Sequence, residues 1–293
     1  MIDKLAIIGV GLIGGSMARA LREEGAVREV VGCGRSRPNL ERAVALGVID
    51  HYTHDVGAAV EGADFVLVAV PLGAMHSTFR AMRGRLAQHA VITDVGSAKA
   101  SVVRDAGDAF GAVPPRFVPG HPIAGTERSG VEASFPGLFR NRRVILTPLA
   151  GTDPDAVERV AWAWRRCGAA VTRMSVEHHD EVLAATSHLP HMLAFGLVDA
   201  LARMKENEEI FRYAAGGFRD FTRIASSNPV MWRDICIANR EALSAMLEAF
   251  SAEMTDLAGT IRRGDGDHLL EIFGRAKAAR DRFVDGADTG GGE

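Results

Sequence analysis

Several side chains that could move a proton or hold an anion stand in short, distinctive runs of this sequence. His121 lies within residues 118–127, Val-Pro-Gly-His-Pro-Ile-Ala-Gly-Thr-Glu, directly after an expected strand, where loops of parallel sheets bind substrates. A neutral imidazole with a pKa of about 6.5 suits general-base catalysis, although a lone histidine more often has a structural role. Arg223 offers a planar fork that matches a carboxylate. Asp220, three residues earlier, could orient Arg223, mask it or simply form an intrahelical ion pair with it.

Two further histidines, His188 and His191, are spaced three residues apart in a helical pattern. This spacing fits metal ligands, satisfied polar groups or the lining of a pocket. No cluster of cysteines or acids completes a metal site in the sequence, so we expect pocket lining and no metal.

A glycine-rich run follows the first expected strand. Gly9, Gly11 and Gly14 form the pattern Gly-x-Gly-x-x-Gly and open a helix. The first glycine permits a tight turn, the second lets backbone approach a pyrophosphate, and the third lets the helix pack on the strand. We expect a dinucleotide at this helix N-terminus rather than a ligand-free turn. The expected contacts are Gly9, Gly11, Leu12, Ile13 and Gly14, with Val70 and Pro71 after a later strand.

The end of the second expected strand bears on the choice of cofactor. An acid normally stands there when the cofactor is NAD, but Gly34 occupies that position. Arg35, Ser36 and Arg37 follow, and two cations with a hydroxyl suit a 2′-phosphate, each charge-assisted bond being worth roughly 1.5–3 kcal/mol. NADP is therefore favoured and NAD remains possible; the alternative is a solvated loop.

Composition excludes several classes of protein. The 293 residues are 47% hydrophobic and 24% charged, as in soluble globular proteins, and the net charge of −3 provides no basic surface for nucleic acid or an anionic membrane. Three cysteines without close spacing indicate a reducing compartment. The apolar stretches 5–18 and 65–79 are interrupted by glycine or proline and are too short to span a bilayer. We expect a cytoplasmic protein with a small-molecule substrate and neither nucleic acid nor membrane as a partner.

The first half of the chain alternates short apolar runs with amphipathic stretches. Residues 65–70 and 90–94 are continuous apolar runs, typical of strands buried on both faces of a parallel sheet. Other strands are expected at 4–9, 29–32, 116–119, 143–147 and 170–174, with helices at 14–24 and from Pro154. This alternation predicts an α/β fold, with a doubly wound Rossmann domain over residues 1–174.

The second half has the periodicity of helices only. Residues 177–205 form one pattern with Pro190 as an expected kink, and another runs from Asn228 to Arg263. A single helix of that second length, roughly 50 Å, needs cover along its apolar face, either from this chain or, as we expect, from a second subunit. The sequence thus predicts an all-helical dimerisation and substrate domain over residues 175–286, a homodimer, and a disordered tail over 287–293.

Five of these runs together resemble a known family. Residues 11–16, 94–99, 118–127, 186–191 and 218–232, in this order, make the chain similar to prephenate/arogenate dehydrogenases of tyrosine biosynthesis over residues 4–285. The resemblance implies a Rossmann domain, a helical dimerisation domain and oxidative decarboxylation of a cyclohexadiene with hydride transfer to NAD(P)+. We expect neither the fused mutase nor the regulatory domain that some family members carry.

The resemblance also implies roles for individual residues. His121 would be the catalytic base, and Ser97 would bond both the reacting hydroxyl and this histidine, although a serine there could equally cap the following helix. Arg223 would bind the substrate carboxylate. The other expected substrate contacts are His188, His191, Trp232, Thr126, Glu127 and Asp220.

Two rival functions share parts of this pattern. A β-hydroxyacid-type dehydrogenase would have a catalytic lysine on a helix of the second domain, but Lys205 and Lys277 stand in no such motif. A non-catalytic NADP-binding sensor would not need Ser97, His121 and Arg223 together. The choice between prephenate and arogenate stays open.

Overall fold

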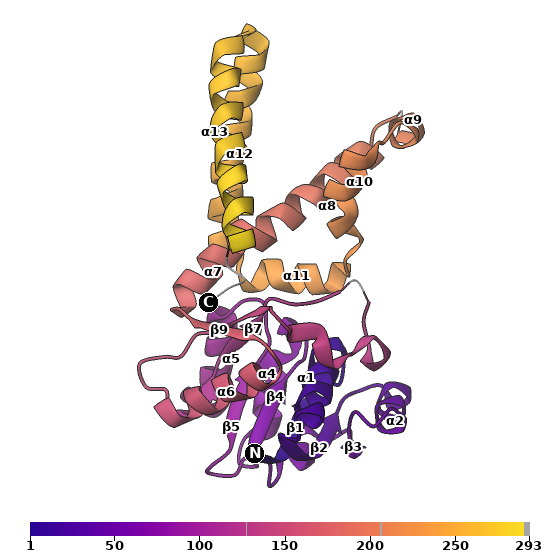
Figure 1. Cartoon of the computed structure of the whole chain (residues 1–293), viewed down its shortest axis with the longest axis vertical. Helices are drawn as coiled ribbons and strands as arrows, with labels where there is room; N and C mark the ends of the chain where they lie inside the picture. The colour runs from indigo at the N-terminus through magenta and orange to yellow at the C-terminus, as the bar shows by residue number, and fades with distance from the viewer. Residues whose placement is uncertain (127, 206, 290–293) are drawn as a thin grey trace. The chain divides into compact units, whose positions relative to one another are not determined.

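A computed structural model describes residues 1–126, 128–205 and 207–289 of the chain (Figure 1). The chain forms two compact units that divide between Leu243 and Ser244.

The first unit begins with a six-stranded, wholly parallel sheet in the order β3-β2-β1-β4-β5-β6. Its strands are β1 (Ile2–Ile8), β2 (Val27–Cys33), β3 (His51–Thr53), β4 (Phe65–Val68), β5 (Val91–Asp94) and β6 (Phe117–Val118). The order reverses between β1 and β4, where open α/β sheets bind their ligands. The doubly wound fold predicted from the sequence is confirmed.

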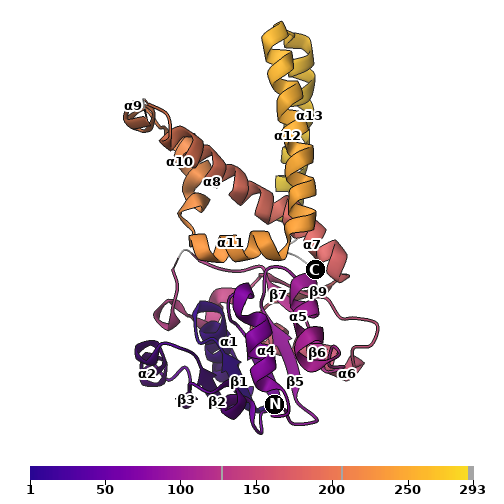
Figure 2. The same cartoon turned by 180° about the vertical axis from the view of Figure 1, so that it is seen from behind.

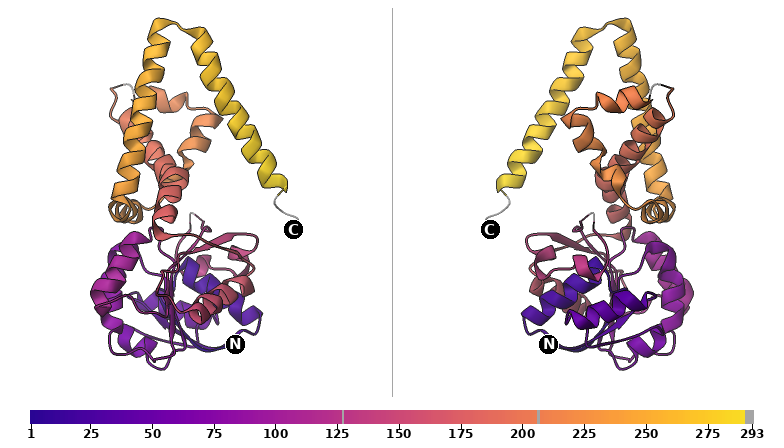
Figure 3. Two further views of the ribbon diagram at one scale, coloured as in Figure 1. Left: turned by 90° about the vertical axis from the view of Figure 1, so that its left-hand side faces the viewer. Right: turned by 90° about the vertical axis from the view of Figure 1, so that its right-hand side faces the viewer.

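Helices cover both faces of this sheet, as the edge-on views of Figure 3 show. Alternate residues of β1 explain the two layers: Leu5 and Ile7 enter one buried cluster, while Ala6 and Ile8 enter the other. The first cluster includes side chains of α1 (Leu12–Glu23), α2 (Arg37–Ala45) and α6 (Pro154–Arg166). The second includes side chains of α3 (Val56–Val60), α4 (Met75–Met82) and α5 (Ala100–Phe110).

A second, three-stranded sheet follows, and the sequence did not indicate it as separate. It consists of β7 (Gly120–Pro122), β8 (Arg143–Leu146) and β9 (Ala170–Arg173), with β7 antiparallel to β8. His121 therefore lies on a short strand opposite Ile145, not in the loop that its sequence context predicted. The strand pairing fixes the backbone from which its side chain projects.

The helical part of the first unit contains α7 (Val176–Leu183), α8 (Leu189–Ala202), α9 (Asn207–Arg212), α10 (Gly216–Thr222) and α11 (Pro229–Ala238). Figures 1 and 2 show α10 lying along α8. A π-helical turn, Ala184–His188, joins α7 to α8 immediately before Pro190. Because proline lacks the N–H that would bond to residue 186, the expected kink takes the form of this turn.

The single helix expected from residue 228 to 263 is wrong. It breaks at Asn239, whose backbone leaves the helix (φ −110°, ψ 32°), and a separate helix, α12 (Arg240–Arg263), follows. The Asn239 side chain donates to the backbone oxygen of Asp180 and contacts Nδ1 of His188. These long-range bonds hold Asn239 in its non-helical conformation, so the helix does not continue through this residue despite the periodicity of the sequence.

The second unit contains most of α12 and α13 (Gly266–Thr289), joined at Gly264 (φ +67°). The two helices diverge from this turn in Figure 3 and leave apolar side chains exposed, among them Ile261, Leu270 and Phe273. Helix α13 continues to Thr289, three residues into the segment 287–293 that the sequence analysis expects to be a disordered tail. Gly286 lies within this helix, and a glycine costs a formed helix only about 1 kcal/mol, which is too little to end it there. Residues 290–293 lie outside the described part. Among the helices described, none is long and apolar enough to cross a membrane.

Candidate active site

The glycine-rich turn between β1 and α1 has the geometry of a dinucleotide site. Gly9 has φ +102°, and a Cβ there would lie 2.2 Å from the backbone oxygen of Ala69, while a Cβ on Gly14 would lie 2.6 Å from that of Gly9. Both positions therefore require glycine. Gly11 has open space around its missing Cβ, and as N-cap of α1 it provides no side-chain cap. The first N–H groups of α1 are thus left for an anion, as the pattern predicts.

The expected cofactor residues gather around this turn. Leu12 and Ile13 begin α1, and the Val70 nitrogen would lie 3.2 Å from a Cβ on Gly9, with Pro71 following it. Arg35, Ser36 and Arg37 lie exposed after β2. The Ser36 hydroxyl already accepts a bond from the Asn39 N–H and caps α2, so only its own O–H proton remains to donate to a ligand.

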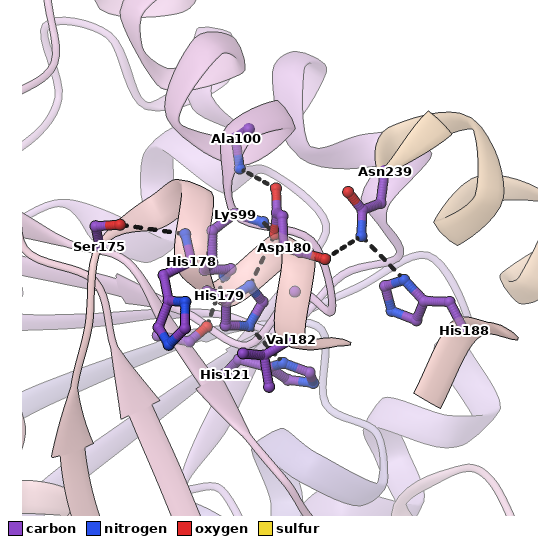
Figure 4. A network of polar contacts seen from close by, with 12 residues as sticks. Lys99, Ala100, His121, Ser175, His178, His179, Asp180, Val182, His188 and Asn239 are labelled. Carbon is purple, nitrogen blue, oxygen red and sulfur yellow. Dashed lines mark hydrogen bonds and ion pairs between the residues drawn. The ribbon is translucent and has the colours of Figure 1, made fainter. Parts of the chain in front are cut away.

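A buried chain of hydrogen bonds holds His121 (Figure 4). Its Nδ1 lies 2.9 Å from Nε2 of His179, and Nδ1 of His179 lies 2.7 Å from Oδ1 of Asp180. The Asp180 carboxylate also accepts the backbone N–H groups of Lys99 (2.7 Å) and Ala100 (2.9 Å) at the start of α5. His121 is thus tied to a helix N-terminus through two intermediate side chains.

A buried ion pair lies beside this chain. Lys99 Nζ is 2.5 Å from Oδ2 of Asp94, with both side chains fully buried, and it also donates to the backbone oxygen of Gly120 at 2.7 Å. This bond fastens β7 next to His121. Burial, and then the charges of His179, Lys99 and His188, hold the pKa of His121 well below its usual range. The imidazole is consequently neutral at physiological pH, as a base must be.

His188 connects this chain to Ser97. Asn239 Nδ2 donates to the Asp180 carbonyl (2.9 Å) and lies 3.1 Å from His188 Nδ1, which must therefore be an acceptor. Burial lowers the pKa of His188 to about 4. The backbone of Ser97 lies near the same ring without a well-formed hydrogen bond. Ser97 does not cap α5, whose first N–H groups are taken by Asp180, so the capping alternative is wrong.

A second group of expected site residues adjoins His188. Trp232 on α11 packs edge-on to His188 with 6.1 Å between ring centroids and stacks on His191 at 3.7 Å. His191 donates from Nδ1 to the Ser187 carbonyl, and the charge of Arg223 is close enough to lower the pKa of His191, an effect secondary to burial. The structure therefore brings six expected residues into one continuous region: Ser97, His121, His188, His191, Arg223 and Trp232.

Three other expected residues are not placed in this group. Asp220 lies in α10, three residues before Arg223. Both side chains are exposed, where an ion pair between them would be worth at most about 1 kcal/mol. The Thr126 hydroxyl is turned toward the backbone of Arg128. Glu127 lies outside the described residues. No group of metal ligands occurs in the described part of the chain.

Sequence reasoning missed four residues of the buried chain: Lys99, His179, Asp180 and Asn239. His178 and His179 were not among the candidate residues of the sequence analysis, and of the two His178 is exposed whereas the side chain of His179 is fully buried. The signal was available, because His179 shares the inward face of α7 with Val176 and Leu183 at helical spacing. Lys99 and Asn239 carried no such signal. Although Asp94 lies five residues before Lys99, the bonds that place Lys99 and Asn239 in the buried chain are made to Asp180, 81 and 59 residues away.

Fold and site together define a nicotinamide-dependent dehydrogenase that combines a Rossmann sheet with a buried, hydrogen-bonded histidine. Residues 17–173 match the family model of the prephenate dehydrogenase nucleotide-binding domain, and residues 175–275 match that of its dimerization domain. The chain belongs to the prephenate dehydrogenase family, which confirms the resemblance seen in the sequence.

Relatives with known names agree with this membership. The chain is 42% identical to a cyclohexadienyl dehydrogenase of Zymomonas mobilis, with 94% of each chain covered. It is 36% identical to a prephenate dehydrogenase of Bacillus subtilis, over 96% of this chain and 76% of that one. Among solved structures, prephenate dehydrogenase of Aquifex aeolicus in complex with hydroxyphenyl propionate and NAD+ is similar at a TM-score of 0.89 and 38% identity, covering 97% of this chain and 98% of that chain.

Proposed function

We propose that this chain oxidatively decarboxylates prephenate, arogenate or both, with His121 as the base and NADP+ as the preferred oxidant. The observation that carries the proposal is the placement of His121. Its Nδ1 is engaged by His179, whereas its Nε2 has no partner among the described residues and is not fully buried. A neutral, oriented and reachable imidazole nitrogen is what removal of a hydroxyl proton requires.

The turn at Gly9, Gly11 and Gly14 fits a dinucleotide, because the space at Gly11 and the uncapped start of α1 can receive a pyrophosphate. A bound nicotinamide supplies the hydride acceptor. Arg35 and Arg37 support a 2′-phosphate, since both are exposed beside the end of β2 and Gly34 provides no competing acid.

The substrate loses a hydride from the ring carbon that carries the hydroxyl, while His121 Nε2 takes the hydroxyl proton and a carbonyl forms. The bond to the ring carboxylate then breaks, CO2 leaves, and its electron pair completes the aromatic ring. The oxygen regains a proton and becomes a phenol, giving 4-hydroxyphenylpyruvate from prephenate or tyrosine from arogenate. Ser97, next to His188, is the proposed partner of the reacting hydroxyl.

Arg223 is the proposed partner of a substrate carboxylate, supported by its proximity to His191 and through it to Trp232. The Trp232 Nε1–H is a buried donor without a partner in the described residues, and an acceptor on the substrate would satisfy it. Thr126, Glu127 and Asp220 stay proposed contacts.

The proposed helical domain, residues 175–286, would form a homodimer. The divergent helices α12 and α13 expose Ile261, Leu270 and Phe273, and a second copy of the chain would cover such apolar faces. Sedimentation at micromolar concentration should give about twice the chain mass of 31.3 kDa. A particle of one chain mass would contradict the dimer.

A four-way assay tests the function: prephenate and arogenate, each with NAD+ and NADP+, followed by nicotinamide reduction and release of CO2. We expect reduction with at least one substrate and faster turnover with NADP+. Failure of all four combinations would overturn the proposed reaction, and better use of NAD+ would overturn the cofactor preference alone.

A further inference from the structure

We propose that His179 and Asp180 act as positioning residues that keep the proton of His121 on Nδ1, so that Nε2 always carries the lone pair. This inference rests on the proposed function of His121 as a base, and it assigns a role to two residues whose side chains are buried behind it. It follows from the direction in which hydrogen bonds run along the buried chain of Figure 4.

The direction is set by groups that cannot reverse. The backbone N–H groups of Lys99 and Ala100 can only donate, and both donate to the Asp180 carboxylate. With these bonds the carboxylate is held ionised, and the pKa of Asp180 is lowered even though burial opposes this. An ionised carboxylate only accepts, so the Nδ1 of His179 at 2.7 Å must carry a proton.

The remaining positions follow in turn. His179 is fully buried, and burial and the charge of Lys99 favour its neutral form against the opposing effect of Asp180. A neutral ring protonated on Nδ1 has its lone pair on Nε2, which can accept only from His121 Nδ1 at 2.9 Å. His121 therefore holds its proton on Nδ1 and presents an unprotonated Nε2.

The same chain supports the charged form that catalysis creates. Once Nε2 of His121 has taken the hydroxyl proton, its Nδ1–H still donates to His179, and the Asp180 charge lies at the far end. In serine proteases a buried carboxylate likewise fixes the tautomer of the catalytic histidine, and loss of that tautomer lowers the rate about 10⁴-fold. Here a second imidazole lies between the carboxylate and the base.

The tautomer can be measured directly. In the full-length protein labelled with ¹⁵N-histidine, the ring nitrogen shifts report which nitrogen of each imidazole carries the proton, and His121→Asn assigns the His121 signals by their disappearance. We expect His121 protonated on Nδ1 in the unmodified protein near neutral pH. Protonation on Nε2 would overturn the proposal without any further variant.

Two substitutions at His179 separate positioning from packing. His179→Leu fills the buried site but gives His121 Nδ1 no acceptor, so the His121 proton should move largely to Nε2. The kcat should then fall on the order of 10²- to 10³-fold while KM changes little. His179→Gln can donate its amide to Asp180 and turn its oxygen toward His121, so it should keep the Nδ1 proton and at least about a tenth of kcat. His178→Gln, at the exposed neighbouring position, is the matched control and should match the unmodified enzyme.

The affinity for NADP+, measured by fluorescence titration, should stay unchanged in the Leu and Gln variants of His179 and in His178→Gln. An unchanged affinity would show that the variants are folded. If His179→Leu leaves the His121 tautomer unchanged, or if the Gln variant is as slow as the Leu variant, His179 does not set the tautomer. If the tautomer moves but kcat does not, the positioning is correct and the proposed role of His121 as base is wrong.

Discussion

The glycine turn of the Rossmann domain and the hydrogen-bonded chain behind His121 differ in how far apart their residues lie in the sequence. The turn lies within six consecutive residues, and its geometry follows from steric rules for glycine. The histidine chain joins positions separated by 58 residues (His121 and His179) and by 81 residues (Lys99 and Asp180). Local sites can therefore be recognised as motifs, whereas a buried polar network must be found through the elements that bring its members together.

The largest effect on kcat should come from a substitution of His121, at the end of the long-range hydrogen-bonded chain. His121→Asn keeps a polar side chain but cannot accept the proton, so kcat should fall roughly 10²- to 10⁴-fold with little change in KM. Steady-state kinetics with saturating NADP+ provides the measurement. A kcat near that of the unmodified enzyme would remove His121 as the base.

Arg223 should show a different kinetic signature. It is proposed to bind a carboxylate that is present before and during hydride transfer, so Arg223→Ala should raise KM by tens to thousands-fold, corresponding to a loss of roughly 2–4 kcal/mol. Arg219→Ala, an exposed arginine on the preceding helix, is the control and should leave KM unchanged. A loss confined to kcat would reverse the roles assigned to Arg223 and His121.

Cofactor preference tests the local site. Aspartate should fit at position 34, because a Cβ there would meet Leu40 only at an ordinary contact distance of 3.6 Å. Gly34→Asp combined with Arg35→Gln should shift the ratio of kcat/KM for NADP+ over NAD+ by about a hundredfold toward NAD+. Arg104→Gln, exposed on α5, should not move the ratio. An unmoved ratio in the double variant would place the 2′-phosphate elsewhere.

Substitutions at Gly9 and Gly11 should affect different properties, the stability of the fold at Gly9 and the binding of the cofactor at Gly11. Gly9→Ala combines a positive φ with a contact 2.2 Å from backbone, so it should destabilise the fold by more than about 2 kcal/mol. Gly11→Ala meets nothing within 4 Å and should leave Tm unchanged while weakening NADP+ binding, by about tenfold. Thermal unfolding and fluorescence titration measure both. Equal Tm values for the two variants would contradict this division.

Much of the α/β half could be predicted because its signals are local. Continuous apolar runs such as residues 65–68 became buried parallel strands, and the turn at Gly9 has the conformation that its pattern requires. The break at Asn239 could not be predicted, because its cause is a pair of bonds to Asp180 and His188 about 50 to 60 positions earlier. The burial of His179 is an intermediate case. The helical periodicity of α7 indicates it, but the adjacent and exposed His178 makes the choice between the two histidines ambiguous.

The pH dependence of kcat tests the central claim most directly. The claim is that the neutral form of His121 removes the hydroxyl proton. The pKa of His121 is depressed by burial and by its neighbours His179, Lys99 and His188. The base is therefore active above this pKa, and kcat should fall only as pH drops through an apparent pKa below the usual value of about 6.5 for histidine. The same acid limb should vanish in His121→Asn, whose residual rate should not depend on pH in this range. An acid limb that persists unchanged in His121→Asn would show that another group is the base.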